Sequence, residues 1–248
     1  MTEALGIRIQ NLHKKFAQRQ VIENLSLEIA PGSFVSVVGP SGCGKSTLLR
    51  LIAGLEKPTN GEVSLSPASA NFSFVFQDAN LLPWRTVAEN VSLPFELDSK
   101  LQQISQAEKN KRVRAALEKV KLEHFESAFP HELSGGMKMR VSLARALVSS
   151  PRLLLMDEPF AALDENTRFE MQNQLRELWL QEKMTVVFVT HSLFESTYLA
   201  ERIIMLKAPG AQKTLDQKIE LPSQRSEDLR TSEDLNKIVK ELSMRLRE

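Results

Sequence analysis

Hydrophobic side chains follow two different patterns along the chain. Residues 7–10 and 25–29 alternate apolar and polar side chains, which is typical of half-buried strands in an antiparallel sheet. Residues 34–38, 153–156 and 185–190 are almost continuously apolar or β-branched, as in buried strands of a parallel sheet. The sequence therefore predicts an α/β fold with a mixed sheet core and an antiparallel β subdomain.

Other segments extend these sheets or have helical periodicity. Residues 63–65, 72–76 and 203–206 have strand patterns. We expect a tight hairpin turn at residues 59–62, because the Asn-Gly pair there accepts a positive φ. Apolar side chains recur at helical spacing in residues 48–55, 113–120, 141–148, 171–182 and 235–246.

The strand patterns are interrupted in the middle of the chain. Residues 78–150 contain several prolines and an amphipathic helix but no buried strand pattern. We therefore expect an α-helical subdomain here, inserted into a nucleotide-binding core formed by residues 5–77 and 151–207. Residues 208–248 form a C-terminal tail with an amphipathic helix, whose apolar face packs either on the body of the chain or on a second copy.

Composition limits the partners and the compartment. The 248 residues contain 32 Lys and Arg against 31 Asp and Glu, so no overall basic field attracts nucleic acid. The single cysteine, Cys43, excludes a disulfide within the chain and indicates a reducing compartment. Residues 1–5 lack the regions of a signal peptide, and no apolar run approaches the roughly 20 residues that span a bilayer. We expect a cytoplasmic protein that reaches a membrane through a partner.

The sequence Gly-Pro-Ser-Gly-Cys-Gly-Lys-Ser-Thr at residues 39–47 matches the phosphate-loop pattern G-x-x-x-x-G-K-[ST]. In such a loop the backbone N–H groups surround phosphates, Lys45 reaches the terminal ones and Ser46 holds Mg²⁺. The loop lies between a strand and a helix N-terminus, which favours an anion. A glycine turn that carries a lysine by chance is the alternative. The expected nucleotide-binding residues are Gly39, Pro40, Ser41, Gly42, Cys43, Gly44, Lys45, Ser46 and Thr47.

A second pair of candidates follows the strand at residues 153–156. Asp157 and Glu158 stand at its carboxyl end, where ligands of open α/β sheets bind. We assign Asp157 to the Mg²⁺ shell and Glu158 to activation of an attacking water. An acidic pair without function is the alternative.

A second glycine-rich helix start lies at residues 134–136. Ser134 is a plausible N-cap, and Gly135 and Gly136 let bare N–H groups approach an anion. A capped helix that binds nothing is the alternative. The chain thus has two candidate anion sites at helix ends.

The sequence allows two interpretations for each of four single residues. Phe16 is either a core aromatic or a ring that stacks on a base, and Gln77 is either solvated or functional. His191 either caps the next helix or senses a phosphate. Cys43 is either a small filler of the loop or a reactive thiol.

Residues 5–207 closely resemble the ATP-binding cassette (ABC) ATPases, because these elements occur in that family's order. Residues 39–47 resemble the Walker A loop, and residues 153–159 resemble the Walker B strand. Gln77 is similar to the Q-loop glutamine, which contributes to catalysis and to the Mg²⁺ site, and His191 is similar to the switch histidine.

The remaining motifs strengthen the resemblance. Residues 133–137 resemble the signature motif, and Asp164 stands in a D-loop-like sequence. Phe16 stands where the family usually has a tyrosine that stacks on adenine, and Met137 replaces a commoner glutamine. The resemblance implies the P-loop NTPase fold of an ABC cassette and hydrolysis of ATP with Mg²⁺, with Lys45, Gln77, Glu158 and His191 as catalytic residues.

The resemblance also implies partners. The signature residues Ser134, Gly135 and Gly136 would close over an ATP held by a second cassette, in a head-to-tail homodimer. Residues 77–85 are similar to the importers of the nitrate, sulfonate and taurine group, in which this segment receives a helix of a membrane permease. Leu82 and Trp84 would line that groove, although Trp84 as a core residue is the alternative.

The expected function is therefore the ATPase subunit of an importer, peripheral on the cytoplasmic face of the inner membrane. Its permease would work with an extracytoplasmic solute-binding protein. A soluble ABC ATPase in an assembly or repair complex is the alternative, and a GTP switch is disfavoured because the motif N-K-x-D is absent.

Overall fold

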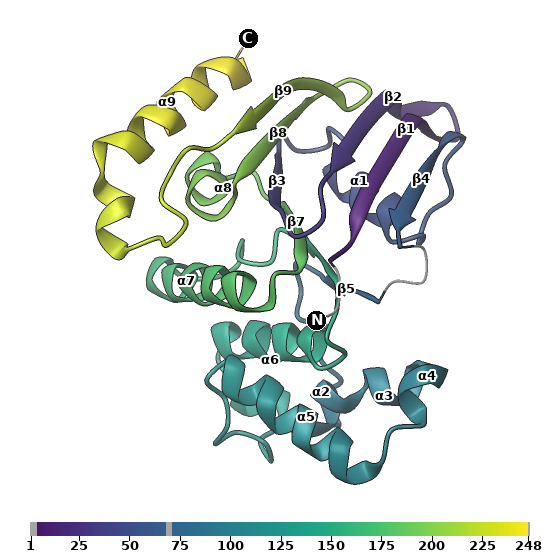
Figure 1. Ribbon diagram of the computed structural model, residues 1–248, viewed down its shortest axis with the longest axis vertical. Helices are drawn as coiled ribbons and strands as arrows, with labels where there is room; N and C mark the ends of the chain where they lie inside the picture. Colours follow the sequence, from purple (N-terminus) through teal and green to yellow (C-terminus); the bar gives the residue numbers. More distant parts are fainter. Residues whose placement is uncertain (1–3, 68–70, 248) are drawn as a thin grey trace.

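The computed structural model describes residues 4–67 and 71–247, and its strands form two sheets (Figure 1). The smaller sheet has the order β2–β1–β4 and is antiparallel. Its strands are β1 (Gly6–Phe16), β2 (Arg19–Ile29) and β4 (Asn60–Ser66). The predicted antiparallel subdomain is present, with β1 and β2 longer than their alternating segments.

The larger sheet has the order β5–β6–β7–β3–β8–β9. Its first five strands are parallel, and β9 runs antiparallel to β8. The carboxyl ends of β5, β6, β7 and β3 therefore lie at one edge, where ligands of such sheets bind. The strands are β3 (Phe34–Val38), β5 (Phe72–Val75), β6 (Leu153–Asp157), β7 (Thr185–Val189), β8 (Arg202–Lys207) and β9 (Gln212–Lys218).

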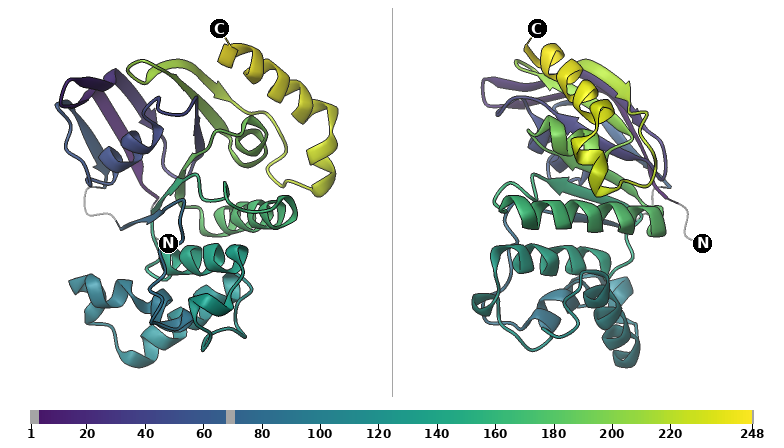
Figure 2. Two further views of the ribbon diagram at one scale, coloured as in Figure 1. Left: turned by 180° about the vertical axis from the view of Figure 1, so that it is seen from behind. Right: turned by 90° about the vertical axis from the view of Figure 1, so that its left-hand side faces the viewer.

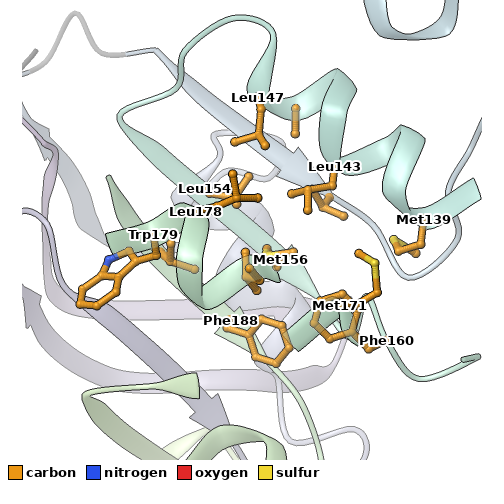
Figure 3. Close-up of a cluster of buried hydrophobic side chains, with 14 of the residues drawn as sticks. Met139, Leu143, Leu147, Leu154, Met156, Phe160, Met171, Leu178, Trp179 and Phe188 are labelled. Atoms are coloured by element: carbon orange, nitrogen blue, oxygen red, sulfur yellow. The ribbon is translucent and has the colours of Figure 1, made fainter. Parts of the chain in front are cut away.

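Helices cover the sheets in layers. Helix α1 (Lys45–Ile52) packs between the two sheets, and α7 (Glu165–Glu182) and α8 (Leu193–Leu199) cover the other side of the larger sheet. Figure 2 shows α7 and α6 (Gly135–Leu147) as successive layers between the sheets and the helices formed by residues 87–119. In Figure 3, side chains from α6, β6, α7 and β7 interdigitate in one buried cluster.

The chain between β5 and β6 forms a group of helices at the lower end of Figure 1. Val91 and Leu117 of this group are fully buried and belong to the same hydrophobic cluster as Phe34 of β3. The helices therefore share a continuous core with the sheet. Besides α6, they are α2 (Val87–Ser92), α3 (Pro94–Leu97), α4 (Ser99–Gln102), α5 (Gln106–Lys119) and the 3-10 turn η1 (Pro130–Glu132).

The C-terminal tail packs on the body of its own chain. It contains the 3-10 turn η2 (Glu227–Thr231) and α9 (Glu233–Arg247), and α9 lies against α8. Leu235 and Leu242 of α9 are fully buried in the main core. Of the two possibilities left by the sequence, packing on the chain's own body is the one observed.

Two local predictions are wrong. Asn60 and Gly61 form no hairpin turn but begin β4, which pairs with β1, and Gly61 has a φ of 77° opposite a shift in that pairing. The positive φ expected from the Asn-Gly pair is present, but it serves a bulge. Leu55 does not belong to α1, which ends at Ile52, and its side chain is 59% exposed.

Candidate functional site

The phosphate-loop sequence connects β3 to α1. All five residues of β3 are buried, so the loop starts from a fixed point in the sheet. Gly44 is the N-cap of α1 and has a φ of 108°, which favours glycine. A Cβ at this position would lie 3.0 Å from the carbonyl oxygen of Val21. The bare backbone lets α1 start directly below the loop and present its N–H groups there.

Lys45 is held inside the loop. Lys45 is 5% exposed. Its Nζ donates to the carbonyl oxygens of Gly39 at 2.8 Å and Pro40 at 3.1 Å. These neutral acceptors solvate the ammonium group without cancelling its charge. The ammonium therefore remains available to an anion in the loop.

Ser46 and Asp157 are in direct contact. The Ser46 hydroxyl donates to Oδ1 of Asp157 at 2.8 Å, although the two residues are 111 positions apart. Burial raises the pKa of Asp157, the hydrogen bond from Ser46 lowers it, and the charge of Glu158 raises it. A cation bound at this hydroxyl and carboxylate would relieve the cost of burying the charged carboxylate.

Glu158 and His191 also meet. Oε2 of Glu158 lies 2.9 Å from Nδ1 of His191. Glu158 has a φ of 46°, which is uncommon outside glycine, and its N–H donates to Val189 at 2.9 Å. Strained backbone of this kind is concentrated at functional sites. The capping interpretation of His191 is wrong, because Ser192 caps α8.

Several residues of the candidate site line one pocket. It has a volume of about 390 Å³, and Lys45, Ser46 and Glu158 line it together with Phe16. Phe16 is 43% exposed, so the interpretation as a core residue is wrong. Nζ of Lys14 lies 4.5 Å from the centre of the Phe16 ring.

Arg19 lines the same pocket and was missed by sequence reasoning. It begins β2, directly after the turn that follows Phe16. Its guanidinium adds a positive charge at the mouth of the loop, near Gly42. No motif marks this residue; the pairing of Phe16 with Arg19 in the β1–β2 hairpin brings it there.

Gln77 lies at the correct sheet edge but outside the pocket lining. Val75 pairs with Met156, so Gln77 follows β5 beside the carboxyl end of β6. Its side chain is exposed. The register of β5 and β6 places Gln77 near Asp157 and Glu158. The roles of Gln77 in catalysis and in binding the metal stay predictions.

The second glycine-rich helix end lies elsewhere. Ser134 caps α6 and accepts the N–H of Met137 at 3.3 Å. Ser134 and Gly136 line a pocket of about 250 Å³ that has no lining residue in common with the phosphate-loop pocket. Gly135 is exposed, with nothing within 4 Å of the place where a Cβ would stand. Within one chain, the two candidate anion sites do not meet.

The chain matches the ABC transporter family over residues 22–161, more than half of its length. The chain belongs to the ABC transporter family. It is 45% identical over 222 residues to the uncharacterized ABC transporter ATP-binding protein MJ0412 of Methanocaldococcus jannaschii, covering 84% of this chain and 80% of that one. It is 43% identical to the aliphatic sulfonates import ATP-binding protein SsuB of Zymomonas mobilis, covering 91% of each.

Solved ABC structures have the same fold. A dimeric structure of the cassette MJ0796 matches with a TM-score of 0.77 and 35% identity, covering 87% of this chain and all of that one. A post-hydrolysis dimer of the same cassette, bound to ADP and Pi, matches with a TM-score of 0.75 and 34% identity. The family, the fold class and the ATPase class predicted from the sequence are confirmed.

Two further residues of the ABC motifs have local structural roles. Asp164 caps α7 by accepting the N–H of Thr167 at 3.0 Å, and its hydrogen bonds with Thr167 lower the pKa of the carboxyl. Cys43 is 1% exposed, and burial raises the pKa of its thiol. The filler interpretation of Cys43 therefore fits the structure, whereas a reactive thiol does not.

The site suits Mg²⁺ shared with a nucleotide. Across residues 4–67 and 71–247, no cluster of three His, Cys, Asp or Glu side chains could hold a metal ion alone. Ser46 and Asp157 offer two hard oxygen ligands beside the phosphate loop. Mg²⁺ commonly takes one or two protein ligands and completes its shell with phosphates and water. The residues present fit such an ion.

Proposed function

We propose that this chain is the ATP-hydrolysing subunit of an ABC importer for an anionic solute of the sulfonate class. The contact between Glu158 and His191 at the wall of the phosphate-loop pocket carries the hydrolytic part of this proposal. The relatives named as aliphatic sulfonates import proteins, at 40–43% identity over most of the chain, support the importer part.

ATP would bind through the loop of residues 39–47. Its triphosphate would lie on the N–H groups at the start of α1, with Lys45 neutralising the terminal phosphates. The exposed Phe16 ring borders the same pocket and would stack on the adenine. Ser46, Asp157 and Gln77 would hold Mg²⁺, which neutralises charge on the phosphates when it is bound.

Hydrolysis would depend on Glu158 as the base. Its carboxylate would accept a proton from the attacking water, because Glu158 lines the same pocket as residues of the phosphate loop. His191 holds one carboxylate oxygen at 2.9 Å and so fixes the direction of the other. Lys45 would stabilise the charge that develops on the transferred phosphoryl group.

A second copy of the chain would complete the site. Ser134 and Gly135 are exposed, whereas Gly136 is buried, and this helix end shares no lining residue with the phosphate-loop pocket of its own chain. In a head-to-tail homodimer this end would close over the γ-phosphate held by the other copy, with Asp164 between them. The two dimeric cassette structures support the dimer.

The permease would dock at a groove between β5 and α3 that is lined by apolar and polar side chains. The groove has a volume of about 490 Å³, and its lining includes Phe74, Phe76 and Leu97. The two phenyl rings stack with centres 4.3 Å apart, and Leu97 is 76% exposed. Leu82 and Trp84 do not line this groove. Trp84 is 71% exposed, so its interpretation as a core residue is wrong.

This docking would place the chain on the cytoplasmic face of the cell membrane. Within residues 4–67 and 71–247, no helix combines the length and the apolar character needed to cross a bilayer. In this proposal, contact with the membrane would run through the permease. An extracytoplasmic solute-binding protein would deliver the solute to that permease.

A pull-down tests the transporter assignment. Tagged Glu158→Gln would be incubated with ATP and Mg²⁺ in detergent-solubilised native membranes, and bound proteins identified by mass spectrometry. Recovery of a polytopic permease supports the assignment. Recovery of soluble partners alone, with the chain absent from membranes, would overturn it in favour of a soluble assembly ATPase.

The solute is tested separately by uptake. Cells that carry the wild-type chain should accumulate a radiolabelled alkanesulfonate, and cells that carry Glu158→Gln should not. Labelled nitrate and taurine serve as comparators. Uptake of nitrate alone would contradict the sulfonate class without affecting the ATPase chemistry.

A further inference from the structure

A buried chain of polar side chains leads from the loop that carries His191 to the C-terminal tail. Its first three members are Thr190, Glu195 and Gln172, which are 2%, 5% and 1% exposed. They come from the end of β7, from α8 and from α7, so tertiary packing brings them together. Hydrogen bonds between buried polar groups restrict the positions of the side chains that make them.

Thr190 fixes the backbone on both sides of His191. Its hydroxyl donates to Oε2 of Glu195 and accepts the N–H of Ser192 at 3.0 Å. The His191 side chain is 61% exposed, so little packing restrains it from outside. The direction of the imidazole toward Glu158 therefore depends on how the backbone of residues 190–192 is held.

Glu195 anchors this loop to α8. Its N–H donates to the Ser192 hydroxyl at 3.2 Å, and its Oε1 accepts from Nε2 of Gln172 at 3.1 Å. Burial raises the pKa of the Glu195 carboxyl, which reflects the cost of placing a carboxylate here. An apolar side chain would pack at lower cost, so packing alone does not explain a glutamate at this position.

Gln172 links Glu195 to Arg230 of the C-terminal tail. While its amide nitrogen binds Glu195, its Oε1 accepts from Nη1 of Arg230 at 2.6 Å. Because both ends of the amide are used, a rotation that breaks one bond breaks the other. Arg230 is fixed in turn between the rings of Phe169 and Tyr198, with its guanidinium carbon 4.2 Å and 3.7 Å from their centres.

We propose that Thr190 and Glu195 are positioning residues for His191, and that Arg230 of the C-terminal tail holds them in place through Gln172. This inference rests on the proposed role of His191 and Glu158 in hydrolysis. It makes the tail part of the catalytic apparatus: displacement of η2 releases Gln172, then Glu195, and finally the loop that aims the imidazole at Glu158.

The first test removes the Thr190 hydroxyl. Thr190→Val in the full-length chain should lower kcat about tenfold or more, since small misplacements of catalytic groups have effects of this size. The dissociation constant for ATP, measured by calorimetry, should stay the same. Thr190→Ser keeps the hydroxyl and should restore kcat, which a purely packing role of the methyl group would not predict.

Thr185→Val is the matched control. Thr185 begins the same strand, is fully buried, and its hydroxyl also donates to one oxygen, that of Leu5, and accepts one N–H, that of Gly32. It lies at the opposite end of β7 from His191. Equal loss of kcat in Thr185→Val and Thr190→Val would overturn the inference, because the loss would then follow from destabilisation of the strand.

The second test substitutes arginines in the C-terminal tail. Arg230→Met should lower kcat with ATP affinity unchanged, whereas Arg225→Met should not. Arg225 lies in the same segment and donates from Nη2 to Ala200 at 3.3 Å, outside the chain to His191. Wild-type kcat in Arg230→Met would overturn the role of the tail.

His191→Ala and Glu158→Gln are measured in the same series. If both retain wild-type hydrolysis, the proposed function has failed. If both lose hydrolysis while Thr190→Val and Arg230→Met keep it, the proposed function stands and the positioning inference has failed.

Discussion

The two glycine-rich helix ends of this ABC ATPase differ in completeness. At the start of α1, Lys45 is buried and Ser46 contacts Asp157, and the pocket there also contains Glu158. At the start of α6, the Ser134 hydroxyl only caps the helix, and Gly135 has open space around it. Both ends present bare N–H groups, but only the first is surrounded by side chains of its own chain that we assign to hydrolysis in the proposed function.

The difference shows what each end contributes. In the proposed function the α1 end would bind ATP and supply the base, so substitutions there should alter the behaviour of a single chain as well as that of a dimer. The α6 end would supply N–H donors to the ATP that another copy holds, so substitutions there should alter hydrolysis and dimer formation but not ATP binding by one chain. Substitutions at the two ends should therefore have different effects on ATP binding and on dimer formation.

The largest effect is expected from Glu158→Gln at the α1 end. Removal of the general base should lower hydrolysis about 1000-fold, within the range for acid–base catalysis. ATP binding should persist, because Lys45 and the loop N–H groups are unchanged. Phosphate release and calorimetric ATP binding measure the two quantities. Hydrolysis within about tenfold of wild type would assign the base to another residue.

A smaller loss is expected from Gly135→Glu at the α6 end. A carboxylate here would repel the γ-phosphate of the partner's ATP and should lower hydrolysis roughly 100-fold, comparable to loss of an oxyanion donor. The side chain has room, since nothing lies within 4 Å of the Cβ position. Gly135→Ala is the control for the added Cβ. If Gly135→Glu also weakened ATP binding at low protein concentration, the separation of the two ends would be wrong.

Phe16→Ala should have a moderate effect at the α1 end. Loss of stacking on adenine should weaken ATP binding about tenfold, since base stacking contributes on the order of 1–3 kcal/mol. Phe16→Tyr keeps the aromatic face and should bind ATP like wild type. Titration of a fluorescent ATP analogue measures both. Unchanged affinity in Phe16→Ala would remove Phe16 from the adenine site.

Cys43→Ala should have the smallest effect. The thiol is buried and its pKa is raised, so the thiolate forms only above the pH at which a free cysteine ionises. Alkylation of the native chain at neutral pH should therefore be slow, and hydrolysis by Cys43→Ala should stay within about twofold of wild type, because no charged or donor group of the pocket is lost. Rapid labelling of the folded protein, followed by mass spectrometry, would contradict this account.

Most of the fold could be predicted from the sequence because its signals are local. Continuous apolar runs marked β3, β6 and β7, and the motif at residues 39–47 marked the loop between β3 and α1. Strand order, by contrast, depends on pairings between distant residues, such as Leu153 with Thr185. The prediction of a turn at Asn60–Gly61 was wrong because it considered only neighbouring residues. The backbone conformation of this pair is set by its pairing with the distant strand β1.

Which residues come together at the candidate site was predictable where a motif names the residue, and less so where only tertiary packing brings residues together. The contact between Ser46 and Asp157 agrees with their assignment to one metal shell. Arg19 and the chain from Thr190 to Arg230 carry no motif, because they meet only after β1, β2, α7, α8 and the tail have packed. The exposure of Phe16 likewise followed from its place at a hairpin end, which its spacing did not reveal.

The most direct test of the account is the oligomeric state of Glu158→Gln with ATP and Mg²⁺, measured by light scattering after size-exclusion chromatography. The account predicts a dimer for Glu158→Gln and for its combination with Gly135→Ala, and a monomer that still binds ATP for its combination with Gly135→Glu. A dimer that persists with Gly135→Glu would contradict the central claim that the α6 end of one copy completes the α1 end of another.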